Sequence, residues 1–428
     1  MAKVVIRESY GSEHESERLY VQTDGQPNSL TSVFLPAGYP DSVSGDYIEY
    51  QLWDSIQAFA SSIMNNLGTH AVLKGVGVGD STATVLAATI TWLLRDGTSM
   101  SGRILFAYIQ SSKLDADCKK WRLFADLIND LSIFIDLLSP YFSHYFLYTQ
   151  CLSGVLKSLV GTAGGATRAA LTQHQSRRNN LADVSAKDGS QETLVNLTAL
   201  ICSLIIVPIV STNTNLVWIL FVCFTLLHIY ANYKAVKSVS LETFNLSRFA
   251  IFVDNYLKTG GDVLPVKTCN TRENVWFFIK DEFDVCSDRI AIGISLQSHR
   301  LSNAKQLNQL IDLYATDDDD CQYILTFETK NKINISLKKN FIPSALLESV
   351  FQAIVLYFAQ NSSQTKDPKL KQIINELNGE SKDTKRLLEL SRKYAIDSMS
   401  RLTAKASAEG WDTSKVLITP SEWRFELS

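Results

Sequence analysis

The sequence lacks the cysteine spacing, the charge excess and the N-terminal apolar run that would place it in several common classes of protein. Its seven cysteines are scattered without a CxxC or CxxH spacing, so neither a zinc site nor a disulfide framework is expected. The net charge of −3 gives no reason to expect nucleic acid as a partner. Residues 1–20 contain no apolar run of the kind found in secretory signals, so we expect a protein that is not secreted.

Nucleotide-binding motifs are missing as well. The glycine-rich run GVGVGD at residues 75–80 has an aspartate where the dinucleotide fingerprint requires its third glycine, and the chain contains no Walker motif. We interpret this run as a break between two helices. No cofactor and no metal ion are expected.

The most distinctive feature that is present is a long stretch without charge. Residues 193–233 contain no Asp, Glu, Lys or Arg, and a polar run at 211–215 divides them into two apolar stretches. Each stretch is near the length of about 20 residues that spans a membrane. Cations flank only the outer ends, which predicts that both ends face the cytosolic side. We therefore predict a multi-pass protein of an intracellular membrane, with the organelle left open. The alternative is a buried helical hairpin in a large soluble core.

Apolar periodicity divides the chain into three parts. Residues 1–44 are polar and punctuated by proline and glycine, which is typical of an irregular leader. Residues 45–240 contain a series of apolar stretches with helical spacing. Residues 241–428 combine amphipathic helices with three β-branched runs, which indicates an α+β domain. The predicted fold is mostly α: a multi-helix, membrane-associated bundle followed by a smaller α+β domain.

Two of the predicted helices combine apolar residues with a group of polar residues that is unusual for a water-facing helix. The helix at residues 51–67 has a polar face with only one charge, so we expect this face to pack against other helices or to line a cavity. The helix at residues 119–139 contains Asp126, Asn129, Asp130 and Asp136. Carboxylates inside a bilayer are costly and usually mark an ion or substrate pathway. The alternative is that Arg122 pairs with Asp126 one turn away on a water-facing surface.

A dense set of charges lies between two apolar helices at residues 164–192, and we predict that it forms a polar recognition surface. The set consists of Arg168, His174, Arg177, Arg178, Asp183, Lys187, Asp188 and Glu192. His174 is a possible general base, and Ser185 with Lys187 a possible nucleophile pair. The sequence identifies no third group to orient either of them, so no catalytic residue is assigned. A charged connector with internal salt bridges is the structural alternative.

Small residues recur at helical spacing just before this segment. Gly154, Ser158, Gly161 and Gly165 would form a groove that allows close approach of a neighbouring helix. This face predicts tight packing, either within the chain or with a second copy or a protein partner.

Six unusual strings resemble the root UV-B sensitive family, and the resemblance spans roughly residues 35–255. They are LPAGYPDSV (35–43), YQLWDS (50–55), WRLFADLIND (121–130), DLLSP (136–140), GATRAALTQH (165–174) and ADVSAKDGSQET (182–193). The resemblance implies a protein linked in plants to UV-B responses, auxin transport and pyridoxal phosphate homeostasis, without an established enzymatic activity. Plastid members carry long transit segments, whereas this chain starts close to the shared region, so we expect a non-plastid relative.

Three functions are compatible with these observations. The first is a non-enzymatic membrane protein that binds or scaffolds partners through residues 164–192. The second is a transporter-like helical bundle for a small metabolite, supported by the carboxylates above and by a predicted polar loop at residues 95–103. The third is an enzyme that uses His174 or the Ser185/Lys187 pair.

Overall fold

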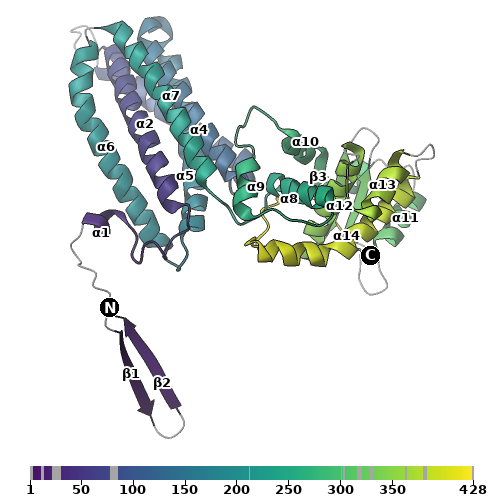
Figure 1. Ribbon diagram of the computed structural model, residues 1–428. Coiled ribbons are helices and arrows are strands. Elements are labelled where there is room, and N and C mark those ends of the chain that lie inside the picture. Colours follow the sequence, from purple (N-terminus) through teal and green to yellow (C-terminus); the bar gives the residue numbers. More distant parts are fainter. Residues whose placement is uncertain are drawn as a thin grey trace.

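The computed structural model describes residues 3–10, 14–21, 30–77, 85–211, 213–299, 301, 304–315, 321–327, 332–361, 364–378 and 383–426 of the chain. Figure 1 shows a bundle of long helices beside a smaller domain, with an N-terminal hairpin apart from both. The predicted mostly α fold, a helical bundle followed by a smaller α+β domain, is confirmed.

Six long helices form the bundle and alternate in direction (Figure 1). They are α2 (Tyr47–Val76), α3 (Val85–Leu114), α4 (Cys118–Leu138), α5 (Phe146–Gln175), α6 (Leu181–Ser211) and α7 (Thr214–Ser238). The 30 residues of α2 correspond to a length of about 45 Å, longer than the hydrocarbon thickness of a bilayer. Short links join the helices; two turns of 3₁₀ helix, η1 (Ser139–Tyr141) and η2 (Ser143–Tyr145), connect α4 to α5.

The structure corrects two of the predicted helix boundaries. Helix α2 continues beyond residue 67, where the predicted helix ends. It stops at the glycine-rich run, as the predicted break requires, and Gly77 there adopts a φ of 90° that favours glycine. Residues 78–80 of that run lie outside the described residues. The predicted polar loop at 95–103 is instead part of α3, because its hydroxyl side chains bond to carbonyls one turn earlier and do not interrupt the helix.

The first 44 residues are not wholly irregular, in contrast to the prediction. Strands β1 (Lys3–Tyr10) and β2 (His14–Val21) pair as an antiparallel hairpin, and helix α1 (Leu30–Phe34) follows. α1 lies against α6, and the backbone of Ala37 donates to Asp183 of α6. The end of the leader is therefore attached to the bundle.

The C-terminal domain packs helices around a small mixed sheet. Its helices are α8 (Leu246–Thr259), α9 (Val266–Arg272), α10 (Glu282–Arg289), η3 (Leu296–His299), α11 (Ala304–Tyr314), α12 (Pro343–Asn361), α13 (Pro368–Asn378) and α14 (Thr384–Ala408). Its strands are β3 (Ile290–Ile292), β4 (Tyr323–Phe327), β5 (Ile333–Lys338) and β6 (Arg424–Phe425). β5 is central: it pairs in parallel with β3 and β6 and antiparallel with β4. One continuous apolar core joins these elements, with α12 buried through its middle.

Candidate functional site: a polar cavity in the helical bundle

The polar face of α2 points into the bundle. α2 contacts α4, α6 and α7, so it is the central helix. Gln57 is buried, and Asn66 donates a hydrogen bond of 2.8 Å to the hydroxyl of Ser203 on α6. Polar groups away from water are costly unless they are hydrogen-bonded, so the polar faces of several helices meet in the interior. The prediction that this face of α2 packs against helices or lines a cavity is confirmed.

A cavity of about 460 Å³ lies between α2, α4, α5 and α6. α2 lines it with hydroxyls and amides, and Gly164 and Gly165 of α5 leave space because a side chain at either position would meet no atom within 4 Å. Charged groups of both signs come from all four helices: Asp54 of α2, Arg122 and Asp126 of α4, Arg168 of α5 and Glu192 of α6. No aromatic side chain is among the described residues that line the cavity. The cavity therefore suits a small solute bound by charge and hydrogen bonding.

Arg122 is the cation on the α4 wall of the cavity. Its Nη2 donates to Oδ1 of Asp54 on α2 at 2.8 Å, whereas its Nε is buried without a hydrogen-bond partner. The predicted pair of Arg122 with Asp126 one turn away is wrong, because Arg122 crosses to another helix. The positive charge of Arg122 in the cavity wall attracts an anionic oxygen of a bound solute.

Three of the four polar residues predicted on α4 lie in the cavity wall or directly behind it. Asp126 lines the cavity and accepts hydrogen bonds from Gln57 at 3.1 Å and from Asn232. Asn129 also lines the cavity and donates to Ser61. Asp130 lies behind them, beside His228 of α7.

Asp136, the fourth of these residues, belongs to a separate pair near the other end of α4. Its Oδ2 lies 2.5 Å from Nζ of Lys157 on α5, and its side chain is almost fully buried. Gln150 of α5 donates to the other oxygen at 3.4 Å. This pair joins α4 to α5 and does not line the cavity.

The charges predicted to form a recognition surface pair within the chain. Arg168 binds Asp188 and Glu192, and Arg168 and Glu192 line the cavity. His174 lies 2.9 Å from Asp46, and Asp46 also accepts from the backbone of Ser240. The remaining pairs are Arg177 with Glu242, Arg178 with Asp41, Lys187 with the carbonyl of Ser32, and Asp183 with the backbone of Ala37. These contacts fasten the lower end of the bundle to α1 and to the start of the C-terminal domain.

The candidate nucleophile pair is not assembled. Ser185 and Lys187 are two positions apart on α6 and therefore project from different faces of the helix. The ammonium of Lys187 donates to a backbone carbonyl, and Ser185 is exposed. Among the described residues, no three His, Cys, Asp or Glu side chains lie together as a metal site would require.

The small-residue face of α5 is used inside the chain. A side chain at Gly154 would meet Ser99 and Arg95 of α3, and Gly102 of α3 lies against Ser158. Close approach of α3 therefore requires the first half of this face. Gly165, at its other end, opens to the cavity.

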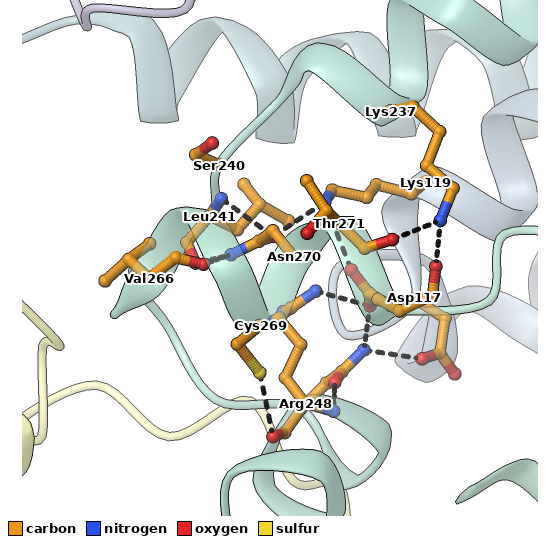
Figure 2. Close-up of polar contacts among 12 residues, drawn as sticks. Asp117, Lys119, Lys237, Ser240, Leu241, Arg248, Val266, Cys269, Asn270 and Thr271 are labelled. Atoms are coloured by element: carbon orange, nitrogen blue, oxygen red, sulfur yellow. Dashed lines mark hydrogen bonds and ion pairs between the residues drawn. The ribbon is translucent and has the colours of Figure 1, made fainter. Parts of the chain in front are cut away.

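A second buried polar cluster joins the bundle to the C-terminal domain. Glu273 lies 3.1 Å from Nζ of Lys119 and 2.7 Å from Nη1 of Arg248, and all three side chains are at most 2% exposed. Figure 2 shows Lys119 reaching Asn270, and Lys237 reaching the carbonyl of Thr271 at 3.0 Å. Burial alone would raise the pKa of Glu273, but Arg248 and Lys119 outweigh it and lower the pKa to about 2. The cluster holds the two domains together.

Sequence reasoning missed Gln57, Asp54 and His228 as members of the site. Asp54 and Gln57 were recognised only as part of a polar face, and a single histidine in an apolar helix is usually a core residue. The signal available was the absence of lysine and glutamate opposite the apolar face of α2, which predicted an inward polar surface.

Comparison with known proteins agrees with the resemblance seen in the sequence. Residues 22–260 match a family described as "Vitamin B6 photo-protection and homoeostasis domain", and residues 262–427 match "Root UVB sensitive protein, C-terminal". The boundary between the two matches falls between α8 and α9, although the core of the C-terminal domain already includes α8.

Similar curated proteins carry names of the same family. The chain is 46% identical over 278 residues to RUS family member 1 of Dictyostelium discoideum, covering 64% of this chain but only 52% of that protein. It is 37% identical over 332 residues to protein root UVB sensitive 3 of Arabidopsis thaliana, covering 76% of this chain and 74% of the relative. Protein root UVB sensitive 6 of Arabidopsis thaliana is 27% identical, with 92% of this chain and 77% of the relative covered. No solved structure matches this chain.

Proposed function

The chain belongs to the root UVB sensitive family, and we propose that it is a membrane-associated protein whose helical bundle binds a small charged solute. The observation that carries the proposal is the cavity between α2, α4, α5 and α6, which is polar and charged inside a bundle whose outer surface is apolar.

Exposed apolar residues support membrane association. α6 and α7 are long and apolar enough to cross a membrane, yet only 17% of the apolar window of each is buried within the protein. The core helix of a soluble protein would be mostly buried. Large apolar side chains such as Leu204 of α6, Leu226 of α7 and Ile104 of α3 are more than 60% exposed. An apolar surface of this extent matches lipid rather than water.

The lining of the cavity contains the carboxylates of Asp54, Asp126 and Glu192 and the guanidinium groups of Arg122 and Arg168, which supports a ligand that carries charges of both signs. Arg122 and Arg168 offer positive charge to an anionic group, and Asn65 and Asn66 add amide groups. The carboxylates of Asp54, Asp126 and Glu192 are available to accept hydrogen bonds from hydroxyl or ammonium groups. The description of the family names vitamin B6, whose phosphorylated forms combine an anionic phosphate with a hydroxyl and a ring nitrogen. Pyridoxal 5′-phosphate is therefore the first ligand to test.

A binding measurement with the full-length protein in lipid nanodiscs tests the proposal. The absorbance of pyridoxal 5′-phosphate is titrated against wild type, Gly165→Leu and Gly97→Leu. Leucine at 165 enters the cavity without meeting the backbone, so we expect affinity to fall by about tenfold, or roughly 1.4 kcal/mol. Gly97, on α3 away from the cavity, is the matched control and should bind as wild type does. Equal affinity of all three proteins would contradict the assignment of the cavity.

Carbonate extraction tests the membrane part independently. We expect the protein to remain with the membrane pellet, because α6 and α7 expose their apolar surfaces. Recovery of a monomeric protein in the supernatant without detergent would refute membrane insertion.

A partner-binding function is the second candidate. α3 packs mainly on α5, and its outer surface exposes Val85, Leu93 and Tyr108. Such a surface is available to a second copy or to another membrane protein. Cross-linking through a cysteine placed at Tyr108 would detect such a partner. If the chain remains monomeric after cross-linking, this result counts against the function.

A further inference from the structure

A buried histidine lies directly behind the cavity. His228 of α7 is fully buried between α2 and α4. Its Nδ1 lies 2.8 Å from Oδ1 of Asp130, and its Nε2 lies 2.8 Å from Nε2 of Gln57. The amide of Gln57 also donates to Oδ2 of Asp126, a residue of the cavity wall. One glutamine side chain therefore connects the histidine to the cavity.

The contacts of Gln57 define the tautomer of the histidine. An amide nitrogen carries two hydrogens and only donates, so Nε2 of His228 accepts the second hydrogen and holds a lone pair. The ring proton of the neutral imidazole is then on Nδ1, which faces the carboxylate of Asp130. With the Gln57 amide in this orientation, the imidazole is neutral.

Addition of a proton to Nε2 would place two donors against each other. Gln57 relieves this conflict by rotating its amide so that Oε1 faces the imidazolium. The rotation removes the N–H that Asp126 accepts and places Oε1 of Gln57 opposite Oδ2 of Asp126, so this carboxylate oxygen loses a donor and faces another acceptor. No other bond is made or broken: the proton passes from water to Nε2, and Nδ1–H stays with Asp130.

The charges around His228 favour uptake of that proton. α4 presents the carboxylates of Asp126 and Asp130 and the guanidinium of Arg122, and α2 presents Asp54, which Arg122 binds. α7 itself adds only the neutral amide of Asn232. Three carboxylates against one guanidinium leave the cluster net negative around the neutral ring.

We infer that His228 is a proton-binding site that controls the solute cavity through Gln57. The inference deepens the proposed function, on which it rests, by making the cavity respond to protons. Proton binding at His228 changes the hydrogen bonding of Asp126 and, through it, the affinity for a charged solute.

Solid-state NMR of the full-length protein in lipid bilayers tests the site without any ligand. Samples labelled with ¹⁵N at histidine and at the glutamine side chain are compared between about pH 5 and 8, the range in which histidine usually changes charge. We expect the signal of His228 to titrate and the Gln57 amide signal to move with the same midpoint. Both changes should be absent in His228→Gln, which fills the site but takes up no proton, and present in His144→Gln, an exposed control.

Binding of pyridoxal 5′-phosphate over the same pH range tests the coupling. Wild type and His144→Gln should change affinity about tenfold across the range, and His228→Gln should not. Binding that is independent of pH in wild type would overturn the coupling while leaving the proposed function intact. Absence of binding at every pH would refute the ligand, and the NMR titration then decides the inference: a His228 that stays neutral throughout overturns it.

Discussion

The helical bundle and the C-terminal domain distribute polar and apolar side chains in opposite ways. The C-terminal domain has one large apolar core, in which residues such as Leu325, Phe351 and Leu356 are fully buried. The bundle has only small apolar clusters, and its interior contains Asp126, His228 and other polar groups, whereas its surface exposes leucine and isoleucine. In the proposed membrane-associated state, the bundle would face lipid and the C-terminal domain would face water.

The physical reason is that burial of apolar surface lowers the free energy of a protein in water but not in lipid. In water, burial of apolar surface drives folding, so the C-terminal domain places it inside. Between lipid chains there is no such gain, and helices associate through close packing and interior polar contacts. The pairs Asp136–Lys157 and Arg122–Asp54, and the packing of Gly154 on α3, follow that second rule.

The largest difference in stability between the two regions should appear when one large apolar side chain in each is replaced by alanine. Phe351→Ala removes a fully buried ring from the C-terminal core and should cost about 3–5 kcal/mol of stability. Leu204→Ala, on the exposed surface of α6, should change stability in bilayers by no more than about 0.5 kcal/mol. Hydrogen exchange of each domain in nanodiscs measures both. Comparable losses at the two positions would mean that Leu204 is covered by protein rather than by lipid.

The next effect concerns the buried cluster between the regions. Glu273→Gln keeps the size of the side chain but leaves Lys119 and Arg248 buried without their counter-charge, and it should cost about 3 kcal/mol. Thermal unfolding followed by tryptophan fluorescence measures the loss. Glu242→Gln, whose partner Arg177 is partly exposed, is the matched control.

The pH dependence of that loss has a definite sign. Because the pKa of Glu273 falls from its usual 4.5 to about 2 in the folded protein, its carboxylate stabilises the fold fully above pH 4.5. The contribution disappears as the pH falls through this range toward 2. The difference in stability between wild type and Glu273→Gln should therefore narrow at low pH. A difference that stays constant would show that the charge of Glu273 is not responsible.

The smallest effect is expected at the exposed charges of residues 164–192. Arg177→Ala removes a bidentate pair with Glu242 in which both side chains are more than 30% exposed, and it should cost at most about 1 kcal/mol. A loss several times larger would indicate that the lower end of the bundle depends on this contact as strongly as on the Glu273 cluster. The thermal unfolding assay used for Glu273 provides the comparison.

Local features of the fold were predictable because they depend on neighbours in sequence. The apolar period predicted a helix at 119–139, where α4 spans Cys118–Leu138. The β-branched runs at 322–328 and 332–338 predicted β4 and β5 within one residue of their ends. The division of the charge-free stretch at 211–215 was also correct, since α6 ends at Ser211. In contrast, two features were missed: the extension of α2 beyond residue 67 and the passage of α3 through residues 95–103. Glycine and hydroxyl residues inside a long packed helix resemble a break.

The sequence by itself determined which stretches are helical, which are long and apolar enough to cross a membrane, and that α2 has a polar face without the charges of a wet surface. Only the tertiary structure decided which polar groups meet. Gln57 and His228 are separated by 171 positions, and Asp54 and Arg122 by 68, so no local pattern relates them. Periodicity records the face that a residue occupies on its own helix. The partner opposite that face is chosen by how helices pack, and it is there that the cavity and its buried histidine arise.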